Sequence, residues 1–195
     1  MISILPFISI PGAFMSMLGS TLLKEIVVTR GITSPEEILR YLNEGVRSAL
    51  KQNDPLGLSK DGMDLSLISY SASEKVLEFS GAKRPLFQVR DGEIIIHKGD
   101  KKSIGGNSKL IGQPYEGSRI EVQEGDAFYM FSDGYPDQFG GPDNRKFMIK
   151  RFKELIQGIA AENMERQQQL LDETMLDWRG DQKQIDDVLV IGIRV

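Results

Sequence analysis

The chain has 195 residues, 40% of them apolar, with 24 Lys and Arg against 28 Asp and Glu. This length and composition predict one globular domain with its own core, and the near-balanced charge argues against a nucleic-acid partner. The sequence contains no cysteine and a single histidine, His97, which excludes thiol nucleophiles, disulfides and zinc sites built from Cys or several His.

Residues 1–23 carry no charge and could be mistaken for a membrane span. Pro6, Pro11 and Gly12 interrupt the apolar run, and no basic residues precede it, so we expect neither a membrane helix nor a secretory signal. The lack of cysteine fits a cytoplasmic location. We therefore divide the chain into a leader, 1–10, and a domain, 11–195.

Two helices are predicted next. After Pro11, which suits the first position of a helix, apolar residues recur with helical spacing as far as Ile26. The sequence SPEE, 34–37, has the form of a capping box and predicts a second helix up to Leu50. We expect the two helices to pack together. Phe14, Met15 and Met17 are predicted to lie in the core.

Antiparallel strands are predicted in the middle of the chain. Four apolar runs between turn residues indicate a meander over 64–70, 75–80, 84–90 and 92–97, with a hairpin turn at Asp91-Gly92. A loop rich in Gly, Lys and Ser follows at 98–112. The remaining predicted elements are strands at 118–122 and 126–132, a helical region at 146–178 broken near 161–163, and a strand at 188–195.

This order of elements predicts an α+β fold, a layered sandwich of antiparallel β-sheets flanked by helix pairs. Asp133 follows one apolar strand, while Asp186 and Asp187 precede the last one. If those strands are antiparallel neighbours, the carboxylates meet at one sheet edge and favour a bound cation such as Mg²⁺ or Mn²⁺. Gly134 permits a tight turn beside them. The alternative is that all three are ordinary turn acids.

Six segments, in order, resemble the SpoIIE/RsbU-type bacterial serine/threonine phosphatases of the PPM, or protein phosphatase 2C-like, superfamily. They are IPGAFMSMLG, KDGMD, FSGAKRPLF, SIGG, YMFSDGYPDQFGG and DDVLVIGIRV, and the match covers about 11–195. The resemblance implies a sandwich of two antiparallel sheets between helix pairs, with a binuclear Mn²⁺ or Mg²⁺ centre. A metal-bound water would become hydroxide and attack phosphorus.

The resemblance also assigns residues. It implies that Asp133 is a metal ligand and that the Asp-Asp pair supplies another, Asp186 or, as the competing choice, Asp187. Gly134 would shape the turn behind Asp133. As a separate hypothesis, residues 135–141 form a loop beside the substrate entrance, with Gln138, Phe139, Gly140 and Gly141 as candidates for substrate contact.

The partners implied are a phosphorylated regulatory protein of the anti-sigma factor antagonist type and an upstream sensor domain. The family normally carries two strands before the PGAFMS helix, with an Asp on one and Asp-x-Thr-Gly-His-Gly on the other. The segment MISILPFISI has no acid, so the chain resembles a family member without its N-terminal strands and with about half of the metal ligands.

Loss of two strands would leave unpaired sheet edges, for which we expect a homodimer or strand swapping. Three functional alternatives follow from these observations. The chain is a metal-dependent phosphatase domain, a non-catalytic binding or self-association module that keeps the phosphatase fold, or the product of a truncated or frameshifted gene.

Overall fold

The computed structural model describes residues 10–54, 60–106, 110 and 112–195. The predicted leader therefore lies outside the described residues, except for residue 10, with which the first helix begins. Within the described ranges, no helix is long and apolar enough to cross a membrane.

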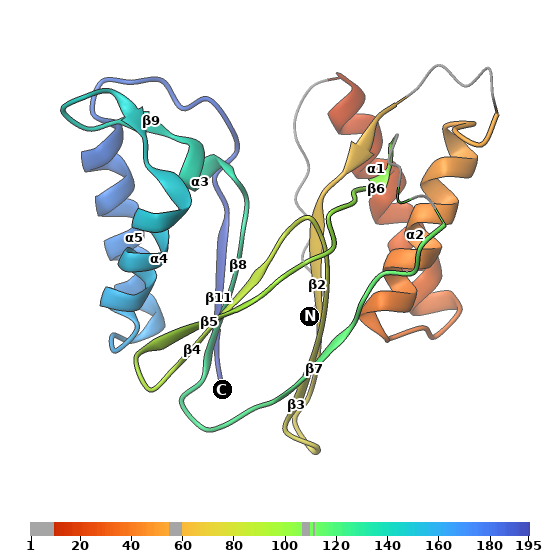
Figure 1. Ribbon diagram of the computed structural model, residues 1–195, viewed down its shortest axis with the longest axis horizontal. Coiled ribbons are helices and arrows are strands. Elements are labelled where there is room, and N and C mark those ends of the chain that lie inside the picture. Colours follow the sequence, from red (N-terminus) through yellow and green to blue (C-terminus); the bar gives the residue numbers. More distant parts are fainter. Residues whose placement is uncertain (1–9, 55–59, 107–109, 111) are drawn as a thin grey trace. The chain divides into compact units, whose positions relative to one another are not determined.

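The chain divides into two compact units (Figure 1). Unit 1 contains the described residues of 1–86 and 97–122, and unit 2 contains 87–96 and 123–195. Each unit combines helices with antiparallel strands, as the pattern predicts.

Unit 1 opens with two helices that share a core. These are α1 (Ile10–Lys24), continued by a π-helical turn (Glu25–Thr29), and α2 (Pro35–Ala49). Leu39 and Leu42 of α2 are fully buried in one cluster with Met15, Leu23 and Ile26. The expected pairing of the two helices is therefore confirmed.

Two details of this helix pair differ from the prediction. Ser34 is the N-cap residue of α2, but its side chain makes no capping hydrogen bond, so the predicted capping box is absent. Phe14 and Met17 are 54% and 72% exposed, although they were expected in the core. The reason is that α1 buries one narrow stripe, to which Met15 and Leu23 belong.

The sheet of unit 1 has the order β2-β3-β7, with β2 (Leu65–Ser71), β3 (Val76–Ala82) and β7 (Ser118–Glu121) all antiparallel. A short pair, β1 (Gly62–Met63) with β6 (Ile104–Gly105), lies partly within the predicted loop. The meander prediction is wrong at the step from β3 to β4 (Leu86–Arg90), because β3 pairs with β7 and not with β4. Lys83 has a left-handed backbone and Pro85 offers no N–H, so the ladder cannot continue there.

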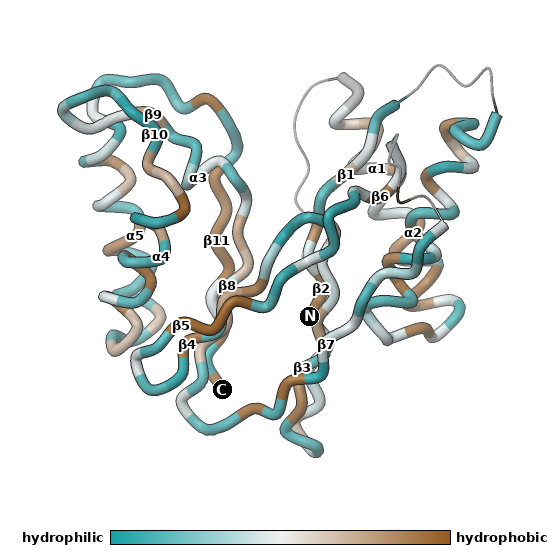
Figure 2. The backbone as a smooth tube through the Cα atoms, in the orientation of Figure 1, coloured by the Kyte–Doolittle hydropathy of each residue, from teal (hydrophilic) through white to brown (hydrophobic). Residues whose placement is uncertain are grey.

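The sheet of unit 2 has the order β11-β8-β4-β5. Its strands are β11 (Val190–Arg194), β8 (Ala127–Phe131), β4 (Leu86–Arg90) and β5 (Glu93–His97). All five residues of β8 are buried, and apolar residues concentrate along β4, β5 and β8 (Figure 2). Asp91 and Gly92 have φ values of 51° and 77°, as the predicted hairpin turn requires.

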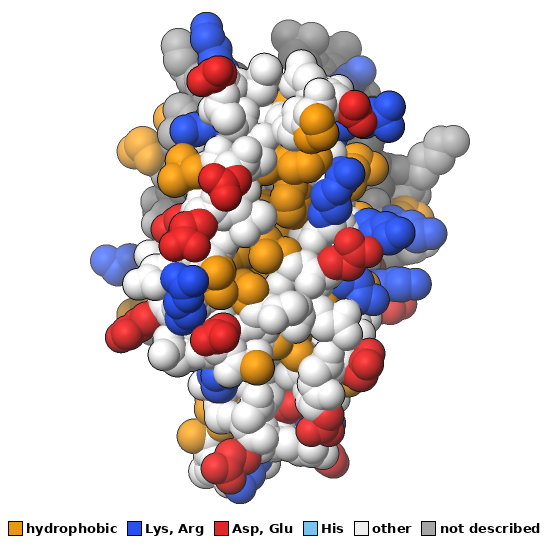
Figure 3. All heavy atoms as spheres, turned by 90° about the vertical axis from the view of Figure 1, so that its left-hand side faces the viewer, with side chains coloured by type: hydrophobic (Ala, Val, Ile, Leu, Met, Phe, Trp, Pro, Cys, Tyr) orange, Lys and Arg blue, Asp and Glu red, His pale blue; other side chains and the backbone are white. Residues whose placement is uncertain are grey.

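Two helices, α4 (Met148–Ile159) and α5 (Met164–Arg179), pack on this sheet. The Phe131 and Phe152 rings lie 4.6 Å apart between their centroids, and Phe152 is fully buried. On the face shown in Figure 3, apolar side chains gather between charged ones. The large exposed apolar side chains of α4 and α5 are Met148, Ile149 and Leu176.

A single helical turn, α3 (Gly134–Asp137), and a hairpin of β9 (Phe139–Gly140) and β10 (Arg145–Lys146) connect β8 to α4. Trp178 of α5 packs edge-on against Phe147, with ring centroids 5.3 Å apart. Its indole Nε1 donates to the Gln138 carbonyl at 3.0 Å, and its own carbonyl accepts from the Gly141 N–H at 2.7 Å. Trp178 thus joins α5 to the hairpin.

Candidate metal centre

Strands β8 and β11 bring the predicted aspartates to one end of the unit 2 sheet. The strands are antiparallel, with Val190 opposite Phe131 and Arg194 opposite Ala127. Asp133 follows the end of β8, and Asp186 and Asp187 precede the start of β11, so the two acidic segments lie at the same edge. The two strands are therefore antiparallel neighbours, which is the condition under which the sequence predicts that the carboxylates meet.

The Ser132 hydroxyl joins the two segments directly. It donates to the Asp187 carbonyl at 2.7 Å and accepts from the Leu189 N–H at 3.0 Å, while the Ser132 N–H donates to the Leu189 carbonyl at 3.0 Å. The pattern predicts that the last strand starts at Val188, whereas β11 starts at Val190. The ladder is interrupted because the Leu189 N–H bonds to a side chain instead of a main-chain carbonyl.

Gly134 lies against the backbone of Asp187. A Cβ atom at this position would be 2.3 Å from the Asp187 carbonyl oxygen, a distance that no side chain tolerates. Glycine is therefore needed here for the close approach of two chain segments. This contact and those of Ser132 fix the backbone on both sides of Asp133.

The three carboxylates differ in their surroundings. The Oδ1 atom of Asp133 is buried, whereas Asp187 is exposed. Asp186 is partly buried, and its Oδ1 accepts from the Asp187 N–H at 2.7 Å. Carboxylate oxygens such as these fit Mg²⁺ and Mn²⁺, which complete their coordination with water. Among the residues that the structure describes, however, no group of three or more His, Cys, Asp or Glu could hold a metal ion.

The residues of the predicted substrate loop differ in their exposure to solvent. Gln138 is fully buried, and its Nε2 donates to the carbonyls of Phe139 and Lys183 at 2.9 and 3.0 Å. Gly140 is buried, and a Cβ there would be 1.8 Å from the Trp178 carbonyl. Gly141, with φ of 67°, lies against the Trp178 ring, where an added Cβ would be 2.7 Å from the nearest ring atoms. Only Phe139, which is 37% exposed, presents a large side chain to solvent.

Sequence reasoning did not single out Ser132 or the inward orientation of Gln138. The only signal for Ser132 was its position, a hydroxyl residue at the end of a buried strand directly before Asp-Gly. No local signal distinguishes Gln138 from a solvent-exposed loop residue, because its partner Lys183 is far away in the sequence.

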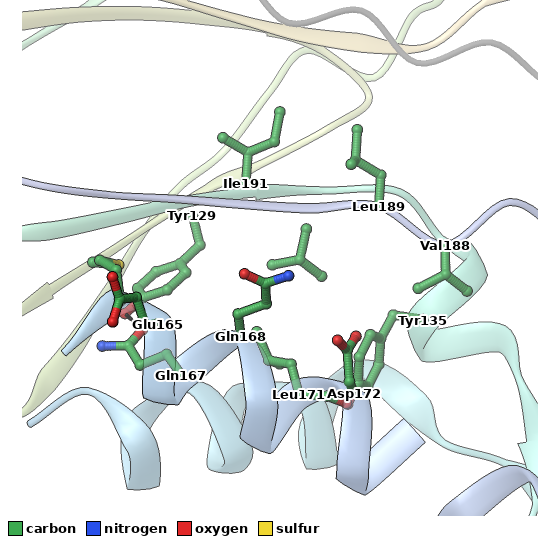
Figure 4. A pocket seen from close by; sticks show the side chains of 13 residues that line it. Tyr129, Tyr135, Glu165, Gln167, Gln168, Leu171, Asp172, Val188, Leu189 and Ile191 are labelled. Atoms are coloured by element: carbon green, nitrogen blue, oxygen red, sulfur yellow. Dashed lines mark hydrogen bonds between the residues drawn. The ribbon is translucent and has the colours of Figure 1, made fainter. Parts of the chain in front are cut away.

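A cavity of about 510 Å³ lies in unit 2 between β11 and α5 (Figure 4). Its wall combines Val188 and Val190 with Leu171, and Gln168 and Asp172 project from α5 toward the strand. None of the three predicted metal-binding aspartates lines it. Its wall does include Leu189, whose N–H bonds to Ser132 beside the candidate metal centre.

Comparison with known proteins connects this fold to one family. The profile of the family described as Stage II sporulation protein E (SpoIIE) matches residues 9–195. The SiaA-PP2C domain of Pseudomonas aeruginosa has 27% identity and a TM-score of 0.83, with coverage of 96% of this chain and 71% of that one. No match was found among curated proteins.

Two further solved structures resemble the chain in fold. One contains the PP2C phosphatase domain and a regulatory-domain fragment of SpoIIE from Bacillus subtilis, with 19% identity, a TM-score of 0.72 and coverage of 100% and 53%. The other contains the RsbU and RsbW domains of a Mycobacterium tuberculosis protein, with 19% identity, a TM-score of 0.68 and coverage of 95% and 48%. The chain thus spans about half the length of these two proteins.

Proposed function

Because the chain belongs to the SpoIIE family of PP2C-like phosphatase domains, we propose that it is a metal-dependent phosphatase acting on phosphoserine or phosphothreonine in a protein. The observation that carries this proposal is the contact of Ser132 with Asp187 and Leu189. This contact joins the segments that hold Asp133 and Asp186 at one sheet edge, where a shared cation would relieve carboxylate repulsion.

We assign Asp133 and Asp186 as the ligands of Mn²⁺ or Mg²⁺, with Asp187 as the alternative to Asp186. When bound, the cation would supply the Lewis-acid chemistry that activates water for hydrolysis of a phosphate ester. The chain's own residues would hold the cation through two carboxylates. Gly134 leaves room for the close packing of the two segments that carry them. Phe139, exposed on the adjoining hairpin, is our candidate for substrate contact.

The proposed substrate is a phosphorylated regulatory protein of the anti-sigma factor antagonist type. We propose a sensor domain upstream and, because the sheets have open edges within the described residues, a homodimer. A cytoplasmic location remains our prediction, and it is compatible with a sequence that contains no cysteine.

A second candidate function is a non-catalytic module that keeps the phosphatase fold for binding or self-association. The observation that favours it is that the described residues contain no group of three or more potential metal ligands. Two carboxylates bind a cation more weakly than the larger ligand sets of tight sites. The two candidates therefore differ in whether the chain binds metal and hydrolyses phosphate.

Titration of the chain with Mn²⁺ by calorimetry, alongside hydrolysis of a phosphoserine peptide, separates them. We expect saturable binding and metal-dependent turnover that Asp133→Asn and Asp186→Asn both abolish. Asp143→Asn is the matched control, since Asp143 is a 71% exposed aspartate outside the site, and it should change neither quantity.

Binding that survives in Asp186→Asn but is lost in Asp187→Asn would transfer the ligand role to Asp187. Absence of binding, or binding without turnover, would contradict the phosphatase proposal and favour the non-catalytic module. For the substrate contact, Phe139→Ala should raise KM for a phosphoprotein and leave Mn²⁺ affinity unchanged, because Phe139 lies on the exposed hairpin.

A further inference from the structure

Two buried polar side chains hold the segment that carries Asp186 from both sides. Ser132, 5% exposed, bonds to the Asp187 carbonyl and the Leu189 N–H. Gln138, with no exposed surface, donates from Nε2 to the Lys183 carbonyl at 3.0 Å. The segment from Lys183 to Leu189 is thus fixed before and after Asp186.

Both of these side chains come from the short stretch that also contains Asp133. Ser132 directly precedes Asp133, and Gln138 follows it after the single turn of α3. The Gln138 backbone is itself held, because its carbonyl accepts from the Trp178 indole and from the Phe147 N–H at 2.9 Å. A shift of either aspartate-bearing segment relative to the other would break these partly buried hydrogen bonds, which is costly.

We propose that Ser132 and Gln138 are positioning residues that set the separation of Asp133 and Asp186 and thereby the affinity of the site for its divalent cation. This inference rests on the proposed function, because it takes these aspartates to be metal ligands. Neither Ser132 nor Gln138 binds the metal itself. The inference also gives Gln138 a different task from the substrate contact expected of it, since its amide group is used inside the protein.

The chemistry of each side chain explains why it cannot be replaced freely. The Ser132 hydroxyl acts as donor and acceptor at once, so alanine would leave the Asp187 carbonyl and the Leu189 N–H without these partners. Gln138 supplies a donor from a fully buried position, so an apolar side chain of similar volume would remove the bond to Lys183 and preserve packing.

The test uses the full chain with three variants, Ser132→Ala, Gln138→Met and the hydroxyl-preserving Ser132→Thr. Ser80→Ala is the matched control, because Ser80 is a fully buried serine of β3 whose Oγ donates to the Glu116 carbonyl at 2.8 Å. It loses a comparable buried hydrogen bond in the other unit. Mn²⁺ affinity is measured by calorimetry, and the midpoint of urea unfolding is measured on the same samples.

We expect Ser132→Ala and Gln138→Met to weaken Mn²⁺ binding by roughly tenfold or more, the usual effect of losing a residue that orients a metal ligand. Ser132→Thr should restore most of the affinity. Ser80→Ala should lower the unfolding midpoint similarly and leave Mn²⁺ affinity unchanged. Unchanged affinity in both Ser132→Ala and Gln138→Met, with binding intact in the unsubstituted chain, would overturn the positioning role alone.

Amide hydrogen exchange, followed by NMR without metal, separates this failure from that of the proposed function. Ser132→Ala should accelerate exchange at Leu189 by roughly tenfold, the loss of one buried hydrogen bond, and Ser132→Thr should not. If the unsubstituted chain binds no Mn²⁺, both the proposed function and the positioning of metal ligands are refuted. The exchange result would then show only whether the hydrogen bond of the Ser132 hydroxyl exists. Unchanged exchange at Leu189 would refute the hydroxyl contact itself.

Discussion

At the scale of single residues, Asp126 is the only buried carboxylate among the residues that the structure describes, with 1% of its surface exposed. Arg90 donates to it from Nε at 2.8 Å and from Nη2 at 2.6 Å. The Gln88 amide and the Gln123 N–H donate as well, at 3.1 and 2.9 Å. Asp126 thus links β4 to the turn before β8 within unit 2.

The surroundings of Asp126 determine the sign of its pH dependence. Burial alone would raise its pKa, but the hydrogen bonds from Arg90, the Gln123 N–H and Gln88, together with the charge of Arg90, outweigh burial and lower the pKa. A carboxylate with a lowered pKa contributes its full stability above the unfolded-state value of about 4. That contribution is lost as the pH falls through the lowered pKa.

We therefore predict that Asp126→Asn lowers the free energy of unfolding at pH 7 by about 2–3 kcal/mol, as expected for loss of hydrogen bonds to a charged group. The difference from the unsubstituted chain should shrink as the pH falls below about 4. Urea denaturation across that pH range measures both effects. The exposed Asp143→Asn should stay within about 0.5 kcal/mol, and a similar loss there would refute the assignment to buried bonds.

At the scale of elements, two helix starts that look alike in the sequence differ in the structure. The Asn163 Oδ1 accepts from the Arg166 N–H at 2.8 Å and caps α5, whereas the Ser34 side chain makes no capping bond to α2. Both residue types are favoured at N-caps, so composition alone does not distinguish them.

Asn163→Ala should cost about 1 kcal/mol of unfolding free energy, the usual cost of losing an N-cap side chain. Ser34→Ala should cost a few tenths at most, since it removes no hydrogen bond to the α2 backbone. Urea unfolding of both variants, measured side by side, provides the comparison. Equal losses would mean that Ser34 does cap α2 in solution.

Element types could be predicted from the sequence because they depend on local periodicity and turn residues. The helix pair of unit 1 and the hairpin turn at Asp91-Gly92 followed from such patterns, whereas the pairing of β8 with β11 entered only as a condition for the metal site. Pairing between distant strands did not, since β3 pairs with β7 across an interval that no local signal spans. The exposure of Phe14 and Met17 was also missed, because apolar residues look alike whichever side of a helix the core occupies.

Part of the candidate site could be predicted from the sequence and part could not. Convergence of the two acidic segments follows from antiparallel pairing alone. The inward amide of Gln138 and the dual hydrogen bond of Ser132 depend on side-chain packing at the end of the sheet, which periodicity does not encode. The functional assignments of the individual aspartates remain predictions.

At the scale of the whole molecule, the proposed cation couples binding to folding. A ligand that binds only the folded state at 100 times its Kd adds about 2.7 kcal/mol of stability. For a chain of this size we expect Mn²⁺ at that excess to raise Tm by about 5–10 °C, measured by calorimetric melting. Asp133→Asn should show no such rise. An equal rise in both proteins would place the bound Mn²⁺ outside the proposed site.

Trp178 is the only tryptophan in the sequence, and it joins α5 to the residues that follow β8. Its indole N–H bonds to the carbonyl of Gln138, the residue whose side chain holds Lys183. The chain consequently carries a single tryptophan fluorophore, which can be excited selectively over the tyrosines and lies two hydrogen bonds away from the segment that bears Asp186. Its emission wavelength would report movement of that segment in the unlabelled protein, on a timescale that stopped-flow mixing can follow.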